Sequence, residues 1–220
     1  MPHTLSKRLQ AIQNMVPHSF VADIGADHGK LVISLVKSNQ VLNAVAVENK
    51  IGPFNRLKKA IEDENLQDQI MALYSDGIKD IPNDVETVII AGMGGFSILK
   101  ILNQSKDKLQ NIQTIIVDGH NAIPSLREGI IKLGYHIDGE SMIYEDNVYY
   151  EIIKFVKGQK EYSDSDIEFG PILRKKKDSL FTNKWNKRIG TIDSLLSKET
   201  LSEERVAELK KERERILSVL

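Results

Sequence analysis

The chain has 220 residues, of which 41% are hydrophobic, a formal net charge of -1 and no cysteine. This length suits one substantial core with an extension, and the lack of cysteine excludes disulfides, thiolate nucleophiles, zinc–thiolate sites and iron–sulfur clusters. No apolar run approaches the roughly 20 residues that cross a bilayer, and residues 1–8 lack the apolar core of a signal peptide, so we expect a cytoplasmic protein without a membrane partner.

The first predicted element is an amphipathic helix, because Leu5, Leu9, Ile12 and Val16 recur at helical spacing up to Pro17. Short apolar runs then appear at residues 20–24, 44–47, 70–73, 85–91 and 112–117. Each is separated from the next by enough chain for a helix. Near-continuous apolar strands that alternate with helices are typical of a parallel sheet buried on both faces, so we predict five β-α units.

The pattern changes after the fifth unit. Residues 135–143 and 149–156 are strand-like and are joined by only five residues, so no crossover helix fits and the two strands should be antiparallel. Five parallel units followed by a hairpin are typical of class I methyltransferases, whereas a dehydrogenase ordinarily continues with another crossover.

The end of the chain has a different composition. Residues 158–170 are polar and predict a linker. Beyond Pro171, two apolar sets at helical spacing, with a turn at residues 198–202, predict an antiparallel α-helical coiled-coil hairpin. We therefore predict an α/β chain with a Rossmann-like catalytic domain at residues 1–157 and a helical coiled-coil domain at residues 158–220.

The first junction between a strand and a helix has the sequence Asp23-Ile24-Gly25-Ala26-Asp27-His28-Gly29. Glycines let a ligand approach the backbone, and the following helix offers free N–H groups. A dinucleotide fingerprint fails because Asp27 and Lys30 replace glycines, and a P-loop fails in spacing and at Leu31. The remaining pattern, D-x-G-x-x-x-G, is typical of S-adenosyl-L-methionine sites. The alternative is a tight turn that holds no ligand.

Three later strand ends carry further candidates. Glu48, beside Asn49, is placed for the ribose hydroxyls, and Asp76-Gly77 for the adenine amino group, because ligands of open α/β sheets bind at the carboxyl ends of strands. Gly92-Met93-Gly94 implies close approach of backbone to a ligand. The Asp/Asn-Pro-Pro-aromatic motif of amino-group methyltransferases is absent, and C5 methylation through a cysteine is excluded. A ring nitrogen, an oxygen or a small molecule remains open as acceptor.

Short segments spread over most of the chain carry a family resemblance: Leu5-Ser-Lys-Arg-Leu9, residues 22–28, Gly52-Pro53, residues 90–95, residues 150–153, Phe169-Gly-Pro171 and Lys184-Trp185. In these segments the sequence resembles the bacterial tRNA adenine-N1 methyltransferases that modify adenine 22 in the D arm. The resemblance implies S-adenosyl-L-methionine as donor, adenine N1 as acceptor, and a C-terminal coiled coil that helps to hold tRNA. The family tends to have Gln-Pro-Asn where this chain has Asp118-Gly-His-Asn121.

Adenine N1 has a free lone pair once it is unpaired, so methyl transfer needs in-line positioning more than a base. Asp118 or Asn121 could steady the resulting positive charge, or could simply cap a strand end. We predict Asp118, Asn121 and Asp27 as catalytic residues. The predicted donor-binding residues are Arg8, Asp23, Gly25, Asp27, His28, Gly29, Glu48, Asn49, Asp76, Gly77, Gly92, Met93 and Gly94. Arg8 has three readings: a partner for the donor's carboxylate, a partner for tRNA phosphate, or an exposed helix arginine. The histidines lack ligand spacing, so we expect no metal.

Charge divides unevenly, with a net -4 on residues 1–156 and +3 on residues 157–220. The basic residues expected to meet phosphate are Arg174, Lys175, Lys176, Lys177, Lys184, Lys187 and Arg188, whereas Trp185 lies on an apolar stripe and is expected in a core. Two rival functions remain: a small-molecule methyltransferase, and a non-catalytic RNA-binding protein with a vestigial pocket. Retention of Gly25, Asp27 and Glu48 argues against the second. We expect tRNA as partner and no obligatory protein partner.

Overall fold

The computed structural model describes residues 5–198 and 201–220, and seven strands within those ranges form one sheet in the order β3-β2-β1-β4-β5-β7-β6. The strands are β1 (Val21–Ile24), β2 (Ala44–Glu48), β3 (Ile70–Tyr74), β4 (Thr87–Met93), β5 (Thr114–Gly119), β6 (Tyr135–Glu145) and β7 (Val148–Lys157). Strands β1 to β5 are parallel, and β7 pairs antiparallel with both β5 and β6. The predicted α/β class, with five parallel strands and a terminal hairpin, is confirmed.

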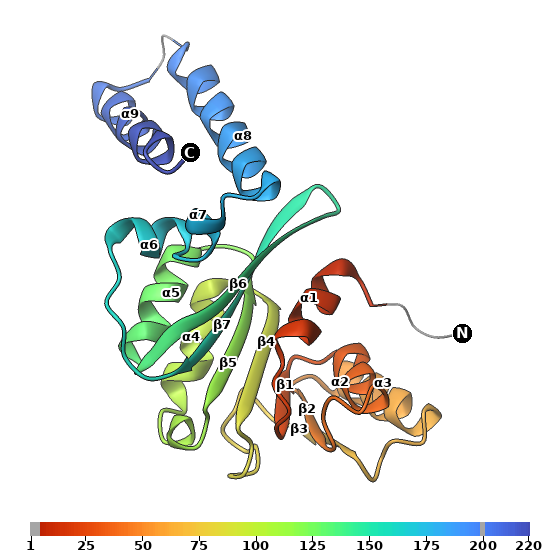
Figure 1. The fold of residues 1–220 in the computed structure, drawn as a ribbon. Coiled ribbons are helices and arrows are strands. Elements are labelled where there is room, and N and C mark those ends of the chain that lie inside the picture. The colour runs from red at the N-terminus through yellow and green to blue at the C-terminus, as the bar shows by residue number, and fades with distance from the viewer. Residues whose placement is uncertain (1–4, 199–200) are drawn as a thin grey trace.

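Helices cover both faces of the sheet (Figure 1). On one face α1 (Lys7–Met15), α2 (Lys30–Lys37) and α3 (Ile51–Asp63) pack on buried residues such as Ala46 and Ile89. On the other face α4 (Gly95–Gln104) and α5 (Ile123–Lys132) pack on residues such as Val45 and Ile90. Neighbouring residues of one strand thus face opposite cores, which explains the continuous apolar runs.

The third β-α unit differs from the prediction, because no helix joins β3 to β4 in the described chain. The connection contains Gly77, whose φ of +71° suits a turn, and Pro82, which cannot continue a helix. Its apolar residues Ile78, Ile81 and Val85 are nevertheless fully buried in the core beside α4. The length of the connection, from which a helix was predicted, is used instead by an irregular segment with buried apolar side chains. A short 3-10 helix, η1 (Lys108–Gln110), precedes β5.

The turn between β6 and β7 is tighter than the five residues predicted. Only Asp146 and Asn147 lie between the strands, with φ values of 50° and 64°. Two successive left-handed residues are the geometry of a type I′ hairpin turn, and Asp and Asn tolerate it.

The predicted linker is partly wrong, because residues 158–170 contain helix α6 (Asp164–Phe169). The side chains of Ser163 and Asp166 form a capping box at its start, and Phe169 is fully buried. Three further helices follow: α7 (Leu173–Lys176), α8 (Ser179–Leu196) and α9 (Glu203–Leu217). The predicted turn at 198–202 includes residues 199 and 200, which lie outside the described residues.

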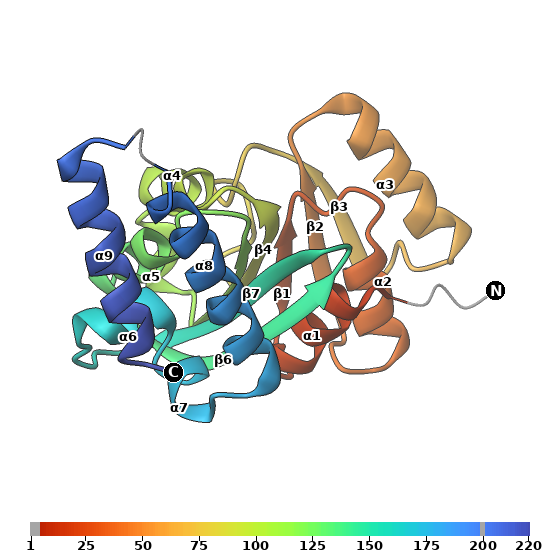
Figure 2. The same ribbon diagram turned by 90° about the horizontal axis from the view of Figure 1, so that it is seen from above.

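A third apolar cluster joins these C-terminal helices to the β6–β7 hairpin. Met142 of β6 lies in it with Phe169, Leu173, Phe181, Ile192, Leu209 and Ile216. Trp185 packs edge-on against Phe169 and Phe181, which confirms its place in a core. Figure 2 shows α8 and α9 side by side, with α8 the nearer of the two to the hairpin. Supercoiling of the two helices stays a prediction. None of the helices described is long and apolar enough to cross a membrane.

Candidate active site

The turn after β1 is fastened to the end of β2. The N–H groups of Gly25 and Ala26 donate to the Val47 carbonyl at 2.9 and 3.2 Å, and Asp27 N–H donates to Glu48 Oε1 at 2.6 Å. Gly25, Asp27 and Gly29 all have positive φ, of 76°, 47° and 65°. The backbone path therefore needs a glycine at Gly25 and Gly29, and Asp27 adopts a conformation that few side chains tolerate.

Two cavities meet at Gly25, at the carboxyl ends of the parallel strands. The first has a volume of about 270 Å³ and the second about 220 Å³, and Gly25 lines both. A Cβ added to Gly25 would lie 2.5 Å from Cε of Met93, so a side chain at this position would collide with Met93 where the two cavities adjoin. Together the cavities form one divided cleft.

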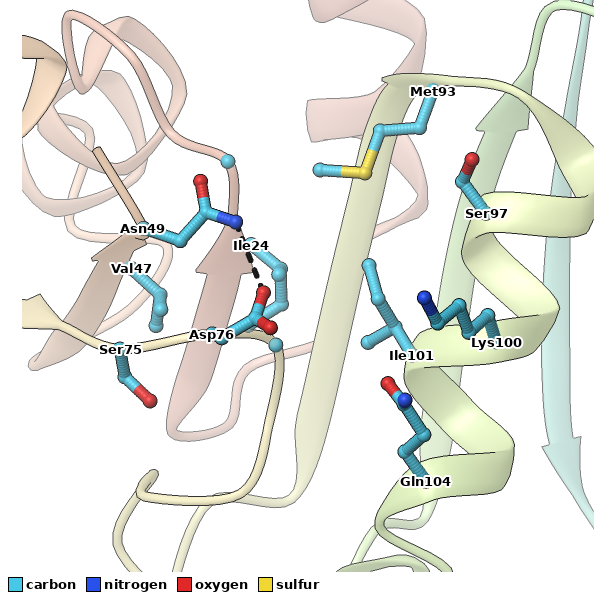
Figure 3. Close-up of a pocket in the computed structure, with 12 residues that line it drawn as sticks. Ile24, Val47, Asn49, Ser75, Asp76, Met93, Ser97, Lys100, Ile101 and Gln104 are labelled. Carbon is cyan, nitrogen blue, oxygen red and sulfur yellow. Dashed lines mark hydrogen bonds between the residues drawn. The ribbon is translucent and has the colours of Figure 1, made fainter.

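The first cavity lies between the carboxyl ends of β1–β3 and one face of α4 (Figure 3). Asn49 Nδ2 donates to Asp76 Oδ1 at 2.9 Å, and this pair faces Met93 and α4 across the cavity. The sequence analysis missed four lining residues of α4: Ser97, Lys100, Ile101 and Gln104. Their spacing of three, one and three residues places them on one helix face, a periodicity that was available in the sequence.

The second cavity is lined by the acidic and basic residues of the glycine turn. Arg8, Asp23, Asp27, His28 and Lys30 contribute polar groups to it. Burial, with the neighbouring Glu48 charge, raises the pKa of Asp23 to about 7. No hydrogen bond from a described residue reaches the Asp23 carboxylate, so this buried acid is available to a cationic ligand.

Glu48, the last residue of β2, is 7% exposed and lies beside the glycine turn, although it lines neither cavity. One carboxylate oxygen is held by the Asp27 N–H, which leaves the other for a ligand. Asp27 itself is exposed, with Arg56 Nη2 3.3 Å from its Oδ1 and His28 Nε2 3.6 Å from its Oδ2. Arg56 is a further residue of the site that was not predicted from sequence.

Arg8 and Asp118 form an ion pair beside this cleft. Arg8 Nη1 donates to Asp118 Oδ2 at 2.6 Å, and the Asp118 side chain is fully buried. Its other oxygen, Oδ1, is buried with no partner among the described residues. Burial raises the pKa of Asp118, although the Arg8 hydrogen bond and charge oppose the rise. Arg8 is 24% exposed and paired with Asp118, so it is not a freely exposed helix arginine. Because it also lines the second cavity, its role as a partner for the donor's carboxylate stays a prediction, as does a contact with tRNA phosphate.

Aromatic side chains complete this corner of the cleft. The Arg8 guanidinium lies over the Tyr150 ring, 5.2 Å from its centroid, and His120 meets the same ring edge-on at 6.0 Å. A Cβ added to Gly92, whose φ is +75°, would lie 3.4 Å from Arg8 Nη1. Gly92 thus admits the guanidinium. Tyr150 was noted from sequence only as part of a motif, with no signal for this contact.

The side chain of Asn121, which follows β5, contacts the start of α4. Its Oδ1 accepts from Gly95 N–H at 3.2 Å and would lie 3.3 Å from a Cβ on Gly94, the residue before the helix. One free N–H of the helix is thereby satisfied. The Asn121 side chain therefore serves the start of a helix and not the strand end proposed from sequence.

Several of the basic residues that were predicted to bind phosphate form ion pairs within the protein. Arg188 binds Glu212 through two hydrogen bonds of 2.7 and 2.8 Å, Arg174 binds Asp166, and Lys184 binds Glu151. Lys176 lies 3.2 Å from Asp178. Lys175, Lys177 and Lys187 are exposed and form no ion pair with a described residue. Arg174, Lys184 and Arg188 therefore each have a protein carboxylate as partner, which competes with the predicted phosphate contact. That contact stays a prediction.

No group of three or more His, Asp or Glu side chains placed to hold a metal occurs in the part of the chain that the structure describes. The polar groups of the cleft are instead suited to an organic cation with hydroxyl and amino groups.

Comparison with known proteins gives consistent matches. The family described as tRNA (adenine(22)-N(1))-methyltransferase matches residues 21–220. The protein of that name from Bacillus subtilis (strain 168) is 32% identical over 199 residues, which covers 87% of this chain and 84% of the relative. A crystal structure of a protein in the NADB-Rossmann superfamily from Streptococcus agalactiae is 29% identical with a TM-score of 0.93, covering 99% of this chain and 97% of that chain.

A third similar structure contains a bound ligand. The structure of M. capricolum TrmK in complex with the natural cofactor product S-adenosyl-homocysteine is 29% identical, with a TM-score of 0.88. It covers 98% of this chain and 97% of that chain. The likeness therefore extends over the glycine turn, the cleft and the C-terminal helices alike.

Proposed function

We propose that the divided cleft at Gly25 is the donor site of a methyltransferase. The chain belongs to the tRNA (adenine(22)-N(1))-methyltransferase family. It therefore transfers methyl groups from S-adenosyl-L-methionine to N1 of adenine 22 in tRNA. The observation that carries this proposal is the meeting of two cavities at a residue without a side chain. The donor has two unlike ends joined at a sulfonium, and a divided cleft with a narrow passage suits that shape.

The adenosine end belongs in the first cavity and the amino-acid end in the second. Asp76, held by Asn49, supplies an acceptor for the adenine amino group, and Glu48 has one oxygen free for the ribose hydroxyls. Buried Asp23 faces the cavity that would take the cationic amino group. A buried carboxylate favours a cation, because the protein offers it no other partner.

The acceptor base belongs at the corner formed by Asp118, His120 and Tyr150. Adenine must leave its pairing partner to enter, because N1 lies on its Watson–Crick edge. The N1 lone pair forms the new N–C bond as the C–S bond breaks and sulfur keeps the electron pair. The base gains a positive charge in this step. Asp118 Oδ1, which is buried without a partner, would accept from the exocyclic amine and balance that charge. A catalytic role for Asn121 and Asp27 stays a prediction. Asn121 Oδ1 accepts from the Gly95 N–H, and the Asp27 carboxylate lies beside Arg56 and His28.

The tRNA body is assigned to α7 and the first half of α8. Residues 172–198 carry eight basic and two acidic side chains, whereas α9 carries five of each. Lys175, Lys177 and Lys187 are exposed without an ion pair among the described residues. Such lysines are free to displace counterions from phosphate. We accordingly divide the chain into a donor-binding domain at 1–157 and a tRNA-contacting helical domain at 158–220, active in the cytoplasm without an obligatory protein partner.

Product analysis tests the reaction. Unmodified tRNA incubated with labelled donor should gain 1-methyladenosine, and reverse transcription should stop at position 22. Nucleosides must be isolated near neutral pH, because alkali rearranges the product to the N6 isomer. A product methylated only at N6 would contradict the acceptor assignment.

A further inference from the structure

A buried ion network lies on the face of β7 opposite the proposed acceptor corner. Arg127 is fully buried and binds Glu140 Oε1 at 2.8 Å and Glu151 Oε2 at 2.5 Å. The other oxygen of Glu151 accepts from Lys184 Nζ. Arg127 and the two glutamates belong to the sheet side of the molecule, on α5, β6 and β7, whereas Lys184 belongs to α8.

The same network fastens the segment that leads to α8. Glu140 Oε2 accepts from the N–H groups of Ile172 and Leu173 at 2.8 and 3.2 Å, and Arg127 Nη1 donates to the Ile167 carbonyl at 3.2 Å. Gly170 has a φ of +84°, and a Cβ there would lie 2.5 Å from Glu140 Oε1 and 2.6 Å from Arg127 Nη2. A side chain at Gly170 would therefore push the segment away from the network.

Strand alternation places this network next to the reacting end of the molecule. Tyr150 and Glu151 are consecutive on β7, so their side chains point to opposite faces. Tyr150 contacts Arg8, the partner of Asp118, while Glu151 contacts Arg127 and Lys184. Glu151 is also opposite Gly119 in the β5–β7 register, one residue beyond Asp118. Figure 1 shows α7 and α8 above this end of the sheet.

Buried ion pairs are weak evidence for stability, because desolvation of the charges offsets their attraction. Their better supported use is to fix one arrangement among several. For Glu151, burial alone would raise the pKa, but the charges of Arg127 and Lys184 hold the pKa below its usual value. The carboxylate therefore stays ionised at neutral pH and keeps both cations in place.

We propose that Glu151 and Lys184 are positioning residues, which hold α8 against β7 so that tRNA bound along α7 and α8 presents its adenine to the Asp118 corner. This inference rests on the proposed tRNA contact of the helical segment. It assigns Lys184 to the protein and not to phosphate, although the lysine is one of a basic run.

The test compares three full-length variants, Glu151→Gln, Lys184→Met and Arg213→Met. Arg213 pairs with Asp193 at 2.7 Å between α9 and α8, so its loss removes one cation from the hairpin without touching the sheet. We expect kcat/KM for tRNA to fall about 3- to 30-fold in Glu151→Gln and Lys184→Met, the range of free energies transmitted through contiguous contacts. Donor affinity and the Arg213→Met rates should stay within about two-fold of wild type, a shift well under the tenfold that 1.4 kcal/mol represents. Lys184→Arg should restore the rate.

Glu151→Gln separates positioning from phosphate contact, because it frees Lys184 from its carboxylate. If Lys184 binds phosphate, Glu151→Gln should keep or improve tRNA binding, and Lys184→Met should flatten the salt dependence by about one unit. That pair of results would overturn the proposal, as would rates equal to those of Arg213→Met. Should Glu151→Gln fail to fold, Lys184→Met and Lys184→Arg decide the question alone, since Lys184 is 24% exposed.

A further full-length variant, Lys175→Glu/Lys177→Glu/Lys187→Glu, tests the proposed tRNA contact separately from the positioning role of Glu151 and Lys184. Normal tRNA kinetics in this variant would remove the proposed tRNA contact itself. Impaired kinetics there, with normal Glu151→Gln and Lys184→Met, would overturn only the positioning role.

Discussion

Arg8 and Asp118 are 110 positions apart in sequence, yet Arg8 Nη1 lies 2.6 Å from Asp118 Oδ2. The pair joins α1, which precedes the sheet, to the carboxyl end of β5. It leaves Asp118 Oδ1 buried and without a partner. An ionised carboxylate at this place would stabilise the positive charge that the target adenine gains on methylation.

The first prediction concerns the pH dependence of transfer in Arg8→Met. Burial raises the pKa of Asp118 and Arg8 opposes the rise, so removing Arg8 should raise that pKa further. Activity that needs ionised Asp118 will then be lost at a higher pH as the solution is acidified. Single-turnover rates across a pH series should show the acid limb of Arg8→Met displaced upward, with a smaller displacement in Arg8→Lys. Superimposable acid limbs would contradict a role for ionised Asp118.

The second prediction concerns Glu48. Glu48→Ala removes a ribose acceptor and should weaken donor binding by about 1.5–3 kcal/mol, or one to two decades in Kd. Because Glu48 also accepts from Asp27 N–H, Glu48→Gln is the matched variant that keeps an oxygen for this bond. Calorimetry on both folded variants is the measurement. Unchanged affinity in Glu48→Ala would remove the ribose assignment.

The third prediction concerns Gly25. Gly25→Ala places a Cβ 2.5 Å from Met93 Cε at a backbone φ of +76°, which narrows the passage between the cavities and strains the turn. Donor affinity should fall by at least about tenfold, the equivalent of 1.4 kcal/mol. Gly190→Ala is the control, because a Cβ on Gly190 in α8 meets nothing within 4 Å. Equal donor affinity in the two variants would argue that the cleft is not divided at Gly25.

The sheet could be predicted from sequence because its cause is local. Apolar runs such as residues 112–117 report burial on both faces, and the short link between the last two strands forces them to be antiparallel. The candidate donor residues Gly25, Glu48 and Asp76 could be proposed from sequence for a related reason. Each follows a recognisable strand, and the carboxyl ends of parallel strands converge at one edge.

The contacts that sequence did not reveal are those between distant segments. Nothing near Arg8 indicates that its partner is Asp118, and a basic run does not show that Lys184 binds Glu151. The absent helix after β3 is a different failure. The chain between β3 and β4 is long enough for a helix, but it forms an irregular segment containing Gly77 and Pro82, from which Ile78 and Ile81 are buried. The length of a connection alone does not fix its conformation.

The fourth prediction concerns Asp23, whose pKa is raised by burial and by Glu48 from 3.8 to about 7. The folded state holds the extra proton between these values, so wild-type stability declines as pH rises through about 7. Asp23→Asn stays neutral and should be more stable than wild type at pH 8 by on the order of 2–4 kcal/mol. Denaturant melts at pH 5 and pH 8 measure the difference. A stability gap that does not grow with pH would contradict the raised pKa.

Donor binding should favour the ionised form of Asp23, whereas folding favours its protonated form. A cationic donor favours ionised Asp23, so binding below about pH 7 must release a proton and weaken. In Asp23→Asn affinity should be lower and nearly independent of pH. Calorimetry in two buffers of different ionisation enthalpy counts the protons released. No release by wild type at pH 6 would place the amino end of the donor elsewhere.

The last prediction concerns the exposed lysines of α7 and α8. Lys175, Lys177 and Lys187 form no ion pair with a described residue, so each is available to phosphate. Neutralising all three as Lys→Gln should weaken tRNA binding and reduce the slope of log K against log salt by about one unit per lost contact. Donor affinity should be unchanged, because every donor residue precedes position 157. Substitution is a cleaner test than truncation after Gly158, which would uncover Arg127 and the apolar contacts of Met142.

The control is Lys210→Gln/Lys211→Gln on α9, where acidic and basic side chains balance. If both variants lower the salt slope equally, charge on the hairpin acts without a defined contact. If neither does, tRNA approaches the cleft by another face of the molecule.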